Sequence, residues 1–262
     1  MAKYIDLHCH PFREYFANPQ DVLNIAYEQG VGTIFLVGTN LQNSQEVLTL
    51  ARQNDFTHAI IGIHPSEATD VKQVDALAAL INSEVVGIGE IGLDYHYPDG
   101  PDPACQQAVF TAQVELARRQ GLPVVVHSRD ADEDTYQFIK TYKQRHPEQD
   151  FILHSYSAGP EYVPKYLALG VYFSFSGVIT FKNAPRVRAA CALVPLERLF
   201  CETDVPYLTP VPHRGQTNLP QYIIYTTDFV AALKGVSSAT LRTHIARNVR
   251  RVFKRLEGGG RQ

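Results

Sequence analysis

The sequence predicts a single (β/α)8 barrel of the TIM type. Eight short runs rich in Val, Ile and Phe alternate with longer segments of helical pattern along the 262 residues. The runs show little alternation of apolar and polar residues, as expected for parallel strands buried on both faces. The chain length matches the usual size of about 250 residues for one such barrel. We therefore expect one α/β barrel domain over residues 1–256 and a flexible tail over residues 257–262.

The predicted elements follow one another in regular alternation. Helices over 19–28 and 105–120 end ahead of Gly30 and Gly121, and glycine is a common helix stop. A doubly wound open sheet is the alternative, but the chain lacks a glycine-rich first turn of the dinucleotide-binding type. The predicted strands are residues 5–7, 33–38, 58–62, 85–89, 123–126, 151–153, 171–174 and 199–201. The predicted helices are residues 19–28, 43–53, 71–81, 105–120, 135–145, 160–169, 184–191, 221–233 and 238–256.

The charge and composition indicate which kinds of partner and which cell compartment the protein has. The net charge of −3 and the lack of an obvious basic cluster argue against a wide groove for long nucleic acid. A nucleic-acid substrate remains compatible with this charge, because bound metal cations supply a positive field locally. The four cysteines are scattered, no signal peptide is visible, and no apolar run approaches membrane-spanning length. These features predict a cytoplasmic protein with no membrane partner and no evident obligate protein partner.

The first predicted strand ends in two histidines. His8 and His10 are two residues apart, so on a strand both imidazoles point to the same side while Cys9 faces away. Two converging imidazoles can begin a site for zinc, manganese or iron. An isolated pair of this kind is more often an ordinary strand end, so the later strands decide between the two interpretations.

Further candidate ligands directly follow later strands. In a (β/α)8 barrel the carboxyl ends of the strands converge on one face, where the loops build the active site. Taken singly, each residue could instead be a turn residue, a solvated carboxylate or a core histidine. Four histidines and two carboxylates at matching strand ends favour a metal site. The candidate metal ligands are His8, His10, Glu90, His127, His154 and Asp204.

This ligand set predicts two divalent metal ions, of Mg, Mn or Zn. Six ligands are too many for one tetrahedral zinc, and an all-oxygen magnesium site would not use four imidazoles. Glu90 is the expected bridge, with one oxygen for each ion. A water between the ions would lose a proton near neutral pH and act as the nucleophile, oriented or deprotonated by Asp204. One ion would take His8, His10, Glu90 and Asp204, and the other Glu90, His127 and His154.

Five short segments form a highly specific set when they occur in this order. They are residues 6–10 (Asp-Leu-His-Cys-His), 62–65 (Gly-Ile-His-Pro), 89–95 (Gly-Glu-Ile-Gly-Leu-Asp-Tyr), 123–129 (Pro-Val-Val-Val-His-Ser-Arg) and 202–208 (Glu-Thr-Asp-Val-Pro-Tyr-Leu). With them the chain resembles the TatD family of metal-dependent deoxyribonucleases, from about residue 4 to residue 253. The resemblance implies a barrel hydrolase with a divalent metal pair that cleaves nucleic-acid phosphodiesters, often from the 3′ end.

The resemblance also implies roles for individual residues. It supports the six candidate ligands by position. From their expected positions at the metal-bound water, we also predict that Glu90 and Asp204 act in catalysis. It places His64 in the pocket, as a group that binds the substrate phosphate or transfers a proton. Two segments depart from the family pattern. Residues 154–159 read His-Ser-Tyr-Ser-Ala-Gly where His-Cys-Phe-Ser-Gly is common, and Leu219 stands where a glutamate is expected.

Candidates for substrate recognition are fewer. Arg129 follows His127 by two residues, so it could face the pocket and bind a phosphate, or pair with Asp130 or Asp132. Arg214 and Lys182 are weaker phosphate candidates. Tyr95 and Tyr97 could stack a base or serve in packing. Asp6 is expected to accept a hydrogen bond that fixes a histidine tautomer.

The leading functional hypothesis is hydrolysis of DNA phosphodiesters by a 3′–5′ exodeoxyribonuclease-like enzyme, with single-stranded 3′ ends as the expected substrate. One alternative is an amidohydrolase-type enzyme acting on small esters, amides or phosphoesters, although a lysine is the frequent bridge there and Glu90 weighs against it. A second alternative is a metal-bearing barrel that binds nucleic acid or protein without cleavage.

Overall fold

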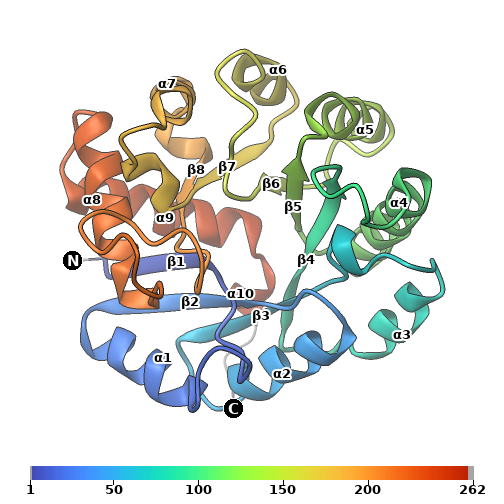
Figure 1. The fold of residues 1–262 in the computed structure, drawn as a ribbon, viewed down its shortest axis with the longest axis horizontal. Coiled ribbons are helices and arrows are strands. Elements are labelled where there is room, and N and C mark those ends of the chain that lie inside the picture. The colour runs from blue at the N-terminus through green and yellow to red at the C-terminus, as the bar shows by residue number, and fades with distance from the viewer. Residues whose placement is uncertain (1, 259–262) are drawn as a thin grey trace.

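The computed structural model describes residues 2–258, which form one sheet of eight parallel strands surrounded by helices (Figure 1). The strands are ordered around the sheet as they occur along the chain. This topology confirms the predicted (β/α)8 barrel. The strands are β1 (Tyr4–Cys9), β2 (Val31–Val37), β3 (Thr57–Ile61), β4 (Val85–Asp94), β5 (Val124–Arg129), β6 (Phe151–Leu153), β7 (Tyr172–Phe175) and β8 (Leu199–Cys201).

Ten α-helices occur in the described part of the chain. Their termini carry familiar caps, such as the Asp102 carboxylate that accepts the Ala104 N–H and the left-handed Gly121 that ends the helix. The helices are α1 (Pro19–Glu28), α2 (Leu41–Ala51), α3 (Gln73–Ala79), α4 (Pro103–Gln120), α5 (Asp132–Arg145), α6 (Val163–Ala168), α7 (Pro185–Leu193), α8 (Ile223–Leu233), α9 (Ser238–Val252) and α10 (Arg255–Gly258). Short 3-10 helices lie at η1 (Pro65–Glu67), η2 (Gly177–Thr180), η3 (Leu196–Arg198) and η4 (Pro220–Tyr222).

The barrel closes between its first and last strands at a β-bridge that joins Cys9 to Val205. The Asp204 N–H donates to the His8 carbonyl at 2.9 Å, and the His10 N–H donates to the Val205 carbonyl at 2.9 Å. Because these bonds lie just past the end of β8, the seam of the barrel is formed by the residues expected to hold metal.

Most observed elements lie within three residues of the predicted bounds, and two predicted elements differ by more. The fourth strand was expected to end at residue 89, but β4 continues to Asp94, so Glu90 lies within a buried strand. The helix expected over 238–256 is interrupted at Phe253. This side chain is fully buried with its ring centroid 4.5 Å from that of Phe35, and the backbone leaves the helix to place it there.

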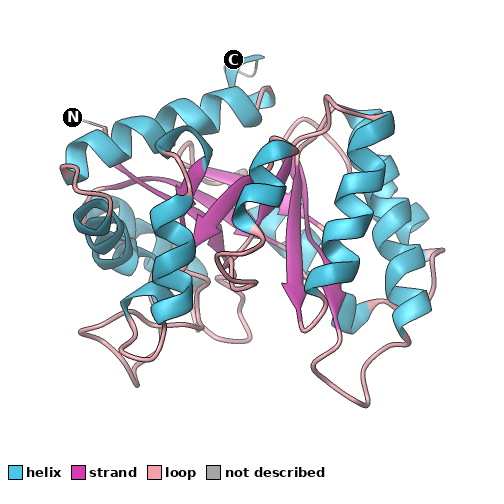
Figure 2. Ribbon diagram, turned by 90° about the horizontal axis from the view of Figure 1, so that it is seen from above, coloured by secondary structure: helices cyan, strands magenta, loops and turns pink. Residues whose placement is uncertain are grey.

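The C-terminal segment covers the amino-terminal end of the barrel. Figure 2 shows that the visible strand arrows point toward loops at one end of the barrel, which is the carboxyl end of the strands. Arg255 donates to the carbonyls of Asn82, Val85 and Gln120, which lie beside the amino ends of β4 and β5. The flexible tail predicted for residues 257–262 stays a prediction. Helix α10 includes residues 257 and 258, and residues 259–262 lie outside the described residues.

No helix among residues 2–258 has the length and apolar character needed to cross a membrane. All four cysteines are free, and Cys9, Cys191 and Cys201 are buried.

Candidate metal centre

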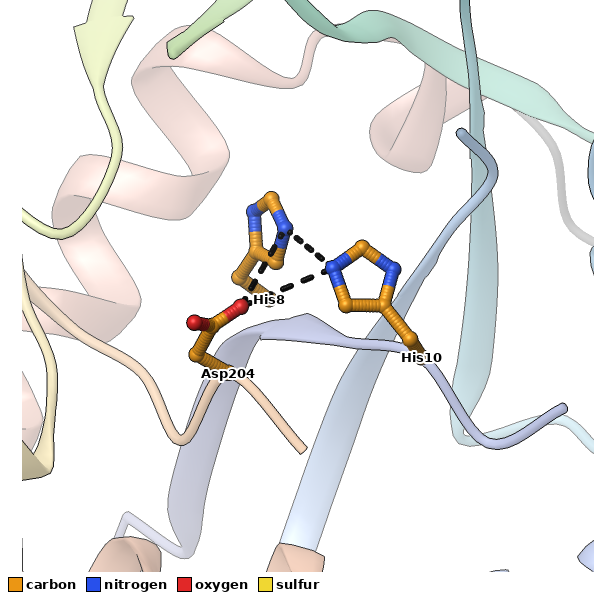
Figure 3. Close-up of side chains that lie close together, drawn as sticks. All are labelled: His8, His10 and Asp204. Atoms are coloured by element: carbon orange, nitrogen blue, oxygen red, sulfur yellow. Dashed lines mark hydrogen bonds and ion pairs between the residues drawn. The ribbon is translucent and has the colours of Figure 1, made fainter. Parts of the chain in front are cut away.

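The first group of candidate ligands lies at the seam of the barrel. His8 is on β1, His10 follows it, and Asp204 follows β8 (Figure 3). The His8 and His10 Nε2 atoms are 3.0 Å apart, and Asp204 Oδ1 lies 3.5 Å from His10 Nε2 and 3.9 Å from His8 Nε2. The His10 Nδ1 is 2.7 Å from the Val37 carbonyl, which orients the ring so that Nε2 faces the others.

Glu90 lies between two groups of imidazoles. Its Oε2 is 3.3 Å from His8 Nε2 and 3.5 Å from His10 Nε2. Its Oε1 is 2.6 Å from His127 Nδ1 and 3.3 Å from His154 Nε2. The carboxylate is buried, so its two oxygens are directed at the two histidine groups and not at bulk solvent.

His127 is held between two carboxylates of the same strand. Its Nδ1 faces Glu90, and its Nε2 lies 3.1 Å from Asp94 Oδ2. Glu90 and Asp94 share one face of β4 with Gly92 between them, because residues two apart on a strand point to the same side. Gly92 has a φ of +149°, and a Cβ there would collide with the His127 carbonyl, so glycine allows β4 and β5 to approach closely.

His154 is oriented by a residue that the sequence did not single out. Its Nδ1 lies 2.7 Å from Glu202 Oε1, and the Ser155 N–H donates to the same oxygen. Glu202 is fully buried behind the ligands, two residues before Asp204. Asp94 was also missed as a site residue. Glu202 lies two residues before the candidate ligand Asp204, and Asp94 lies four residues after Glu90 on the same strand, so an even spacing from a candidate ligand was the available signal for each.

His64 reaches the candidate metal centre from the loop after β3. The Ser66 N–H donates to its Nδ1 at 3.1 Å, so the ring proton of the neutral imidazole is on Nε2. That Nε2 lies 3.7 Å from Glu90 Oε1. Burial lowers the pKa of His64 to about 3, which keeps the ring neutral at physiological pH. His64 therefore presents an N–H donor beside the candidate ligands.

Arg129 is the last residue of β5, two residues after the candidate ligand His127. Its side chain is exposed, its Nη1 donates to the Tyr97 hydroxyl at 3.2 Å, and its guanidinium lies 5.3 Å from the Tyr97 ring centroid. No ion pair of Arg129 with Asp130 or Asp132 occurs among residues 2–258, and Asp130 Oδ2 lies 2.7 Å from His96 Nδ1. Among the other recognition candidates, Tyr95 donates to Asp134, which indicates a packing role. The Arg214 guanidinium stacks over Phe181.

Asp6 differs from the sequence expectation. It accepts from the Thr203 N–H at 2.8 Å, the Thr203 hydroxyl and the His8 N–H at 3.3 Å, and its oxygens contact backbone and hydroxyl groups in place of an imidazole. Burial raises its pKa to about 8. Asp6 thus ties β1 to the segment after β8 directly beneath the candidate ligands.

The two segments that depart from the family pattern are held by hydrogen bonds. Ser155 lies within hydrogen-bond distance of Ser176, and the buried Tyr156 donates to the Gly159 carbonyl. In the late loop, the Asn218 amide donates to the Thr203 and Tyr207 carbonyls at 2.8 and 2.6 Å. Asn218 therefore fastens this loop to the segment that carries the candidate ligand Asp204, without a carboxylate at position 219.

The electrostatics of the centre favour bound positive charge. Burial lowers the pKa of His10, but hydrogen bonds and charge from Asp204 and Glu90 raise it to about 9. For His154, burial is likewise outweighed by Glu202, Glu90 and Asp204, which raise the pKa to about 10. Without metal, protons on these imidazoles compensate the buried carboxylates.

The donor set fits divalent metal. Imidazole nitrogens and carboxylate oxygens converge, and three groups of three donors each lie within 4.8 Å of one another: His8, His10 and Asp204; His8, His154 and Glu202; and His64, Glu90 and His127. Mixed nitrogen and oxygen ligands suit zinc, manganese and related ions. All six predicted ligands belong to or border these groups.

A model of the family of TatD related DNases matches residues 5–254. The chain belongs to this family. TatD relatives include the uncharacterized metal-dependent hydrolase YcfH of Escherichia coli (strain K12), 36% identical over 255 residues that cover 95% of both chains. An uncharacterized metal-dependent hydrolase of Mycoplasma pneumoniae is 37% identical over 265 residues, covering 96% of this chain and 99% of the relative.

Solved TatD structures share the barrel. The TatD homolog YjjV of Escherichia coli superposes with a TM-score of 0.86 at 28% identity, covering 96% of this chain and 98% of YjjV. A TatD family hydrolase from Entamoeba histolytica has a TM-score of 0.83 at 20% identity, covering 96% of this chain and 98% of its own, and shows the common fold. The protein is therefore a TatD-family metal-dependent hydrolase with a (β/α)8 barrel.

Proposed function

We propose that this TatD-family hydrolase cleaves phosphodiester bonds of DNA, as a 3′–5′ exodeoxyribonuclease that uses two divalent cations of Mg, Mn or Zn. The observation that carries the proposal is the position of Glu90, whose two oxygens face two separate imidazole groups at 2.6 to 3.5 Å. A carboxylate placed in this way suits the bridge between two ions.

The residues divide into two sets around that bridge. His8, His10 and Asp204 would hold one cation together with Glu90 Oε2, and His127 and His154 would hold the other together with Glu90 Oε1. When bound, the cations would supply charge that activates a water molecule and stabilises the phosphoryl oxygens and the leaving group. Asp94 and Glu202 would fix the rings of His127 and His154 from outside.

The chain's own groups would handle the proton and the substrate. Asp204 carries an acceptor oxygen at the seam, where it would orient the attacking water and accept its proton. The Nε2–H of His64 would donate to a phosphate oxygen. Arg129 on the exposed rim would bind a phosphate further along the strand, for which its planar fork is suited.

The test is cleavage of 3′-labelled and 5′-labelled single-stranded oligodeoxynucleotides with Mg²⁺, Mn²⁺ or Zn²⁺. We expect stepwise shortening from the 3′ end that stops on chelation and in Glu90→Ala. Full activity after chelation would overturn the mechanism. Products from internal cuts would overturn the exonuclease assignment, and faster turnover of small esters or amides would favour the amidohydrolase alternative. Binding without cleavage in the presence of every metal would favour a non-catalytic barrel.

A further inference from the structure

Two exposed tyrosines form a pair on the rim beside the candidate metal centre. Tyr15, in the loop after β1, is 37% exposed, and Tyr207, in the loop after β8, is 51% exposed. Their ring centroids are 5.8 Å apart in an edge-on arrangement, and their hydroxyl oxygens are 2.6 Å apart. The hydroxyls therefore satisfy each other, which leaves apolar ring surface open to solvent.

The pair is connected to the metal centre from both sides. On one side, the ring centroids of His10 and Phe12 are 5.5 Å apart, and those of Phe12 and Tyr15 are 6.1 Å apart. On the other, the Tyr207 N–H donates to the Asp204 carbonyl at 2.8 Å, which closes a four-residue turn. Such a turn keeps its end Cα atoms within about 7 Å, so Tyr207 is held close to a candidate ligand.

A second aromatic contact lies on the far side of the centre. Tyr97, after β4, is 57% exposed and contacts Arg129 at the end of β5. In the strand order, β2 and β3 separate β1 from β4, and β6 and β7 separate β8 from β5. The two aromatic contacts thus lie on opposite sides of the barrel, with the candidate metal centre between them.

We propose that Tyr15 and Tyr207 form a stacking platform for one base of single-stranded DNA, next to the phosphate that is cleaved. This inference rests on the proposed nuclease function. Stacking on an aromatic ring is independent of base identity, and it suits a rim that carries no broad basic surface. Arg129 and Tyr97 would then contact the DNA on the other side of the scissile phosphate.

The variants that test the platform are Tyr15→Ala and Tyr207→Ala, with Tyr207→Phe to keep the ring while removing its hydroxyl. Tyr27→Ala is the matched control, because Tyr27 is 42% exposed and lies under Lys3 at the opposite end of the barrel. We expect each platform alanine to weaken oligonucleotide affinity about 5- to 150-fold, the range typical of one stacked base. Tyr207→Phe and Tyr27→Ala should bind like the wild type.

An abasic oligonucleotide identifies the contact itself. Removing the base that stacks should weaken binding to the wild type by the same factor as the alanine substitution. The alanine variant should bind the abasic oligonucleotide with no further loss of affinity. Additive losses, or equal affinities of Tyr207→Ala and Tyr27→Ala, would overturn the platform. A 2-aminopurine base at that position should be quenched by the wild type and not by Tyr207→Ala.

These measurements separate the two proposals. Cleavage is read from the product ladder, whereas stacking is read from 2-aminopurine fluorescence and affinity. If the enzyme cleaves oligonucleotides and the platform substitutions change neither affinity nor fluorescence, the nuclease proposal stands and the platform proposal is wrong. If the protein quenches 2-aminopurine through Tyr207 and does not cleave the oligonucleotide, the platform proposal stands and the nuclease proposal is wrong.

Discussion

The Asp94 carboxylate lies 3.1 Å from Nε2 of His127, on the side of the ring opposite Glu90. Asp94 is itself rigidly placed, since the buried Gln106 side chain bonds both its N–H and its carbonyl. A carboxylate behind a metal-binding histidine fixes the tautomer and increases the basicity of the ligating nitrogen. His127 is thus held in one orientation within the candidate metal centre.

Replacing Asp94 should therefore weaken metal binding. We expect Asp94→Ala to lower the affinity for the more weakly held cation by about 10- to 100-fold, the usual cost of losing such a partner. Asp94→Asn keeps an acceptor oxygen and should lose less. Calorimetric titration of the chelated protein measures the effect. Asp99→Asn, in the exposed loop that follows, is the control and should bind metal normally. Unchanged affinity in Asp94→Ala would show that His127 needs no such support.

A methyl group at position 92 should disrupt the same region. In Gly92→Ala the new Cβ would meet the His127 carbonyl at a φ of +149°, so β4 and β5 would have to separate. We expect a loss of about 2 kcal/mol or more in the free energy of unfolding, together with weaker metal binding. Gly87→Ala on the same strand is the control, because its Cβ would make ordinary contacts at 3.4 Å and beyond. Equal stabilities of the two variants would contradict the close-approach argument.

The C-terminal segment should contribute strongly to stability. Phe253 is fully buried at the amino-terminal end of the barrel and packs against Phe35. We expect Phe253→Ala to lower the free energy of unfolding by about 3–5 kcal/mol through lost burial and the cavity left behind. Urea denaturation measures this, with Arg251→Ala on exposed helix surface as the control. A change below about 1 kcal/mol for Phe253→Ala would show that burial of this side chain contributes little to the stability of the barrel.

The chelated protein should lose stability as the pH rises. The pKa values of His10 and His154 are raised from 6.5 to about 9 and about 10, because nearby carboxylates outweigh the opposing effect of burial. A raised pKa in the folded state gives stability that is fully present below pH 6.5 and is lost as the pH rises through 9 to 10. Urea midpoints across this window measure the effect, and His154→Gln should flatten part of the slope.

The same protons compete with metal. Because the imidazoles must be deprotonated to bind a cation, metal addition near pH 7.5 should release protons. Calorimetry in buffers of different ionisation enthalpy would detect them as a buffer-dependent heat. A heat that is independent of the buffer would show that the imidazoles are already neutral in the metal-free protein.

The sequence by itself determined the barrel and the identity of the candidate ligands. Buried parallel strands appear as continuous apolar runs, so most strand positions could be predicted, and His8, His127 and His154 stand where those runs end. The boundaries were less well determined. The continuation of β4 to Asp94 and the break at Phe253 depend on which residues from other elements pack against them. The local pattern of apolar and polar residues does not indicate these tertiary neighbours.

Only the tertiary structure decided how the residues share the site. The two-sided position of Glu90, the support of His154 by Glu202 and the use of Asp6 to hold Thr203 all join residues from different strands. Tyr15 and Tyr207 are likewise brought together from opposite ends of the chain. Contacts of this kind follow from barrel closure, which places the first and last strands side by side, and no local spacing in the sequence encodes them.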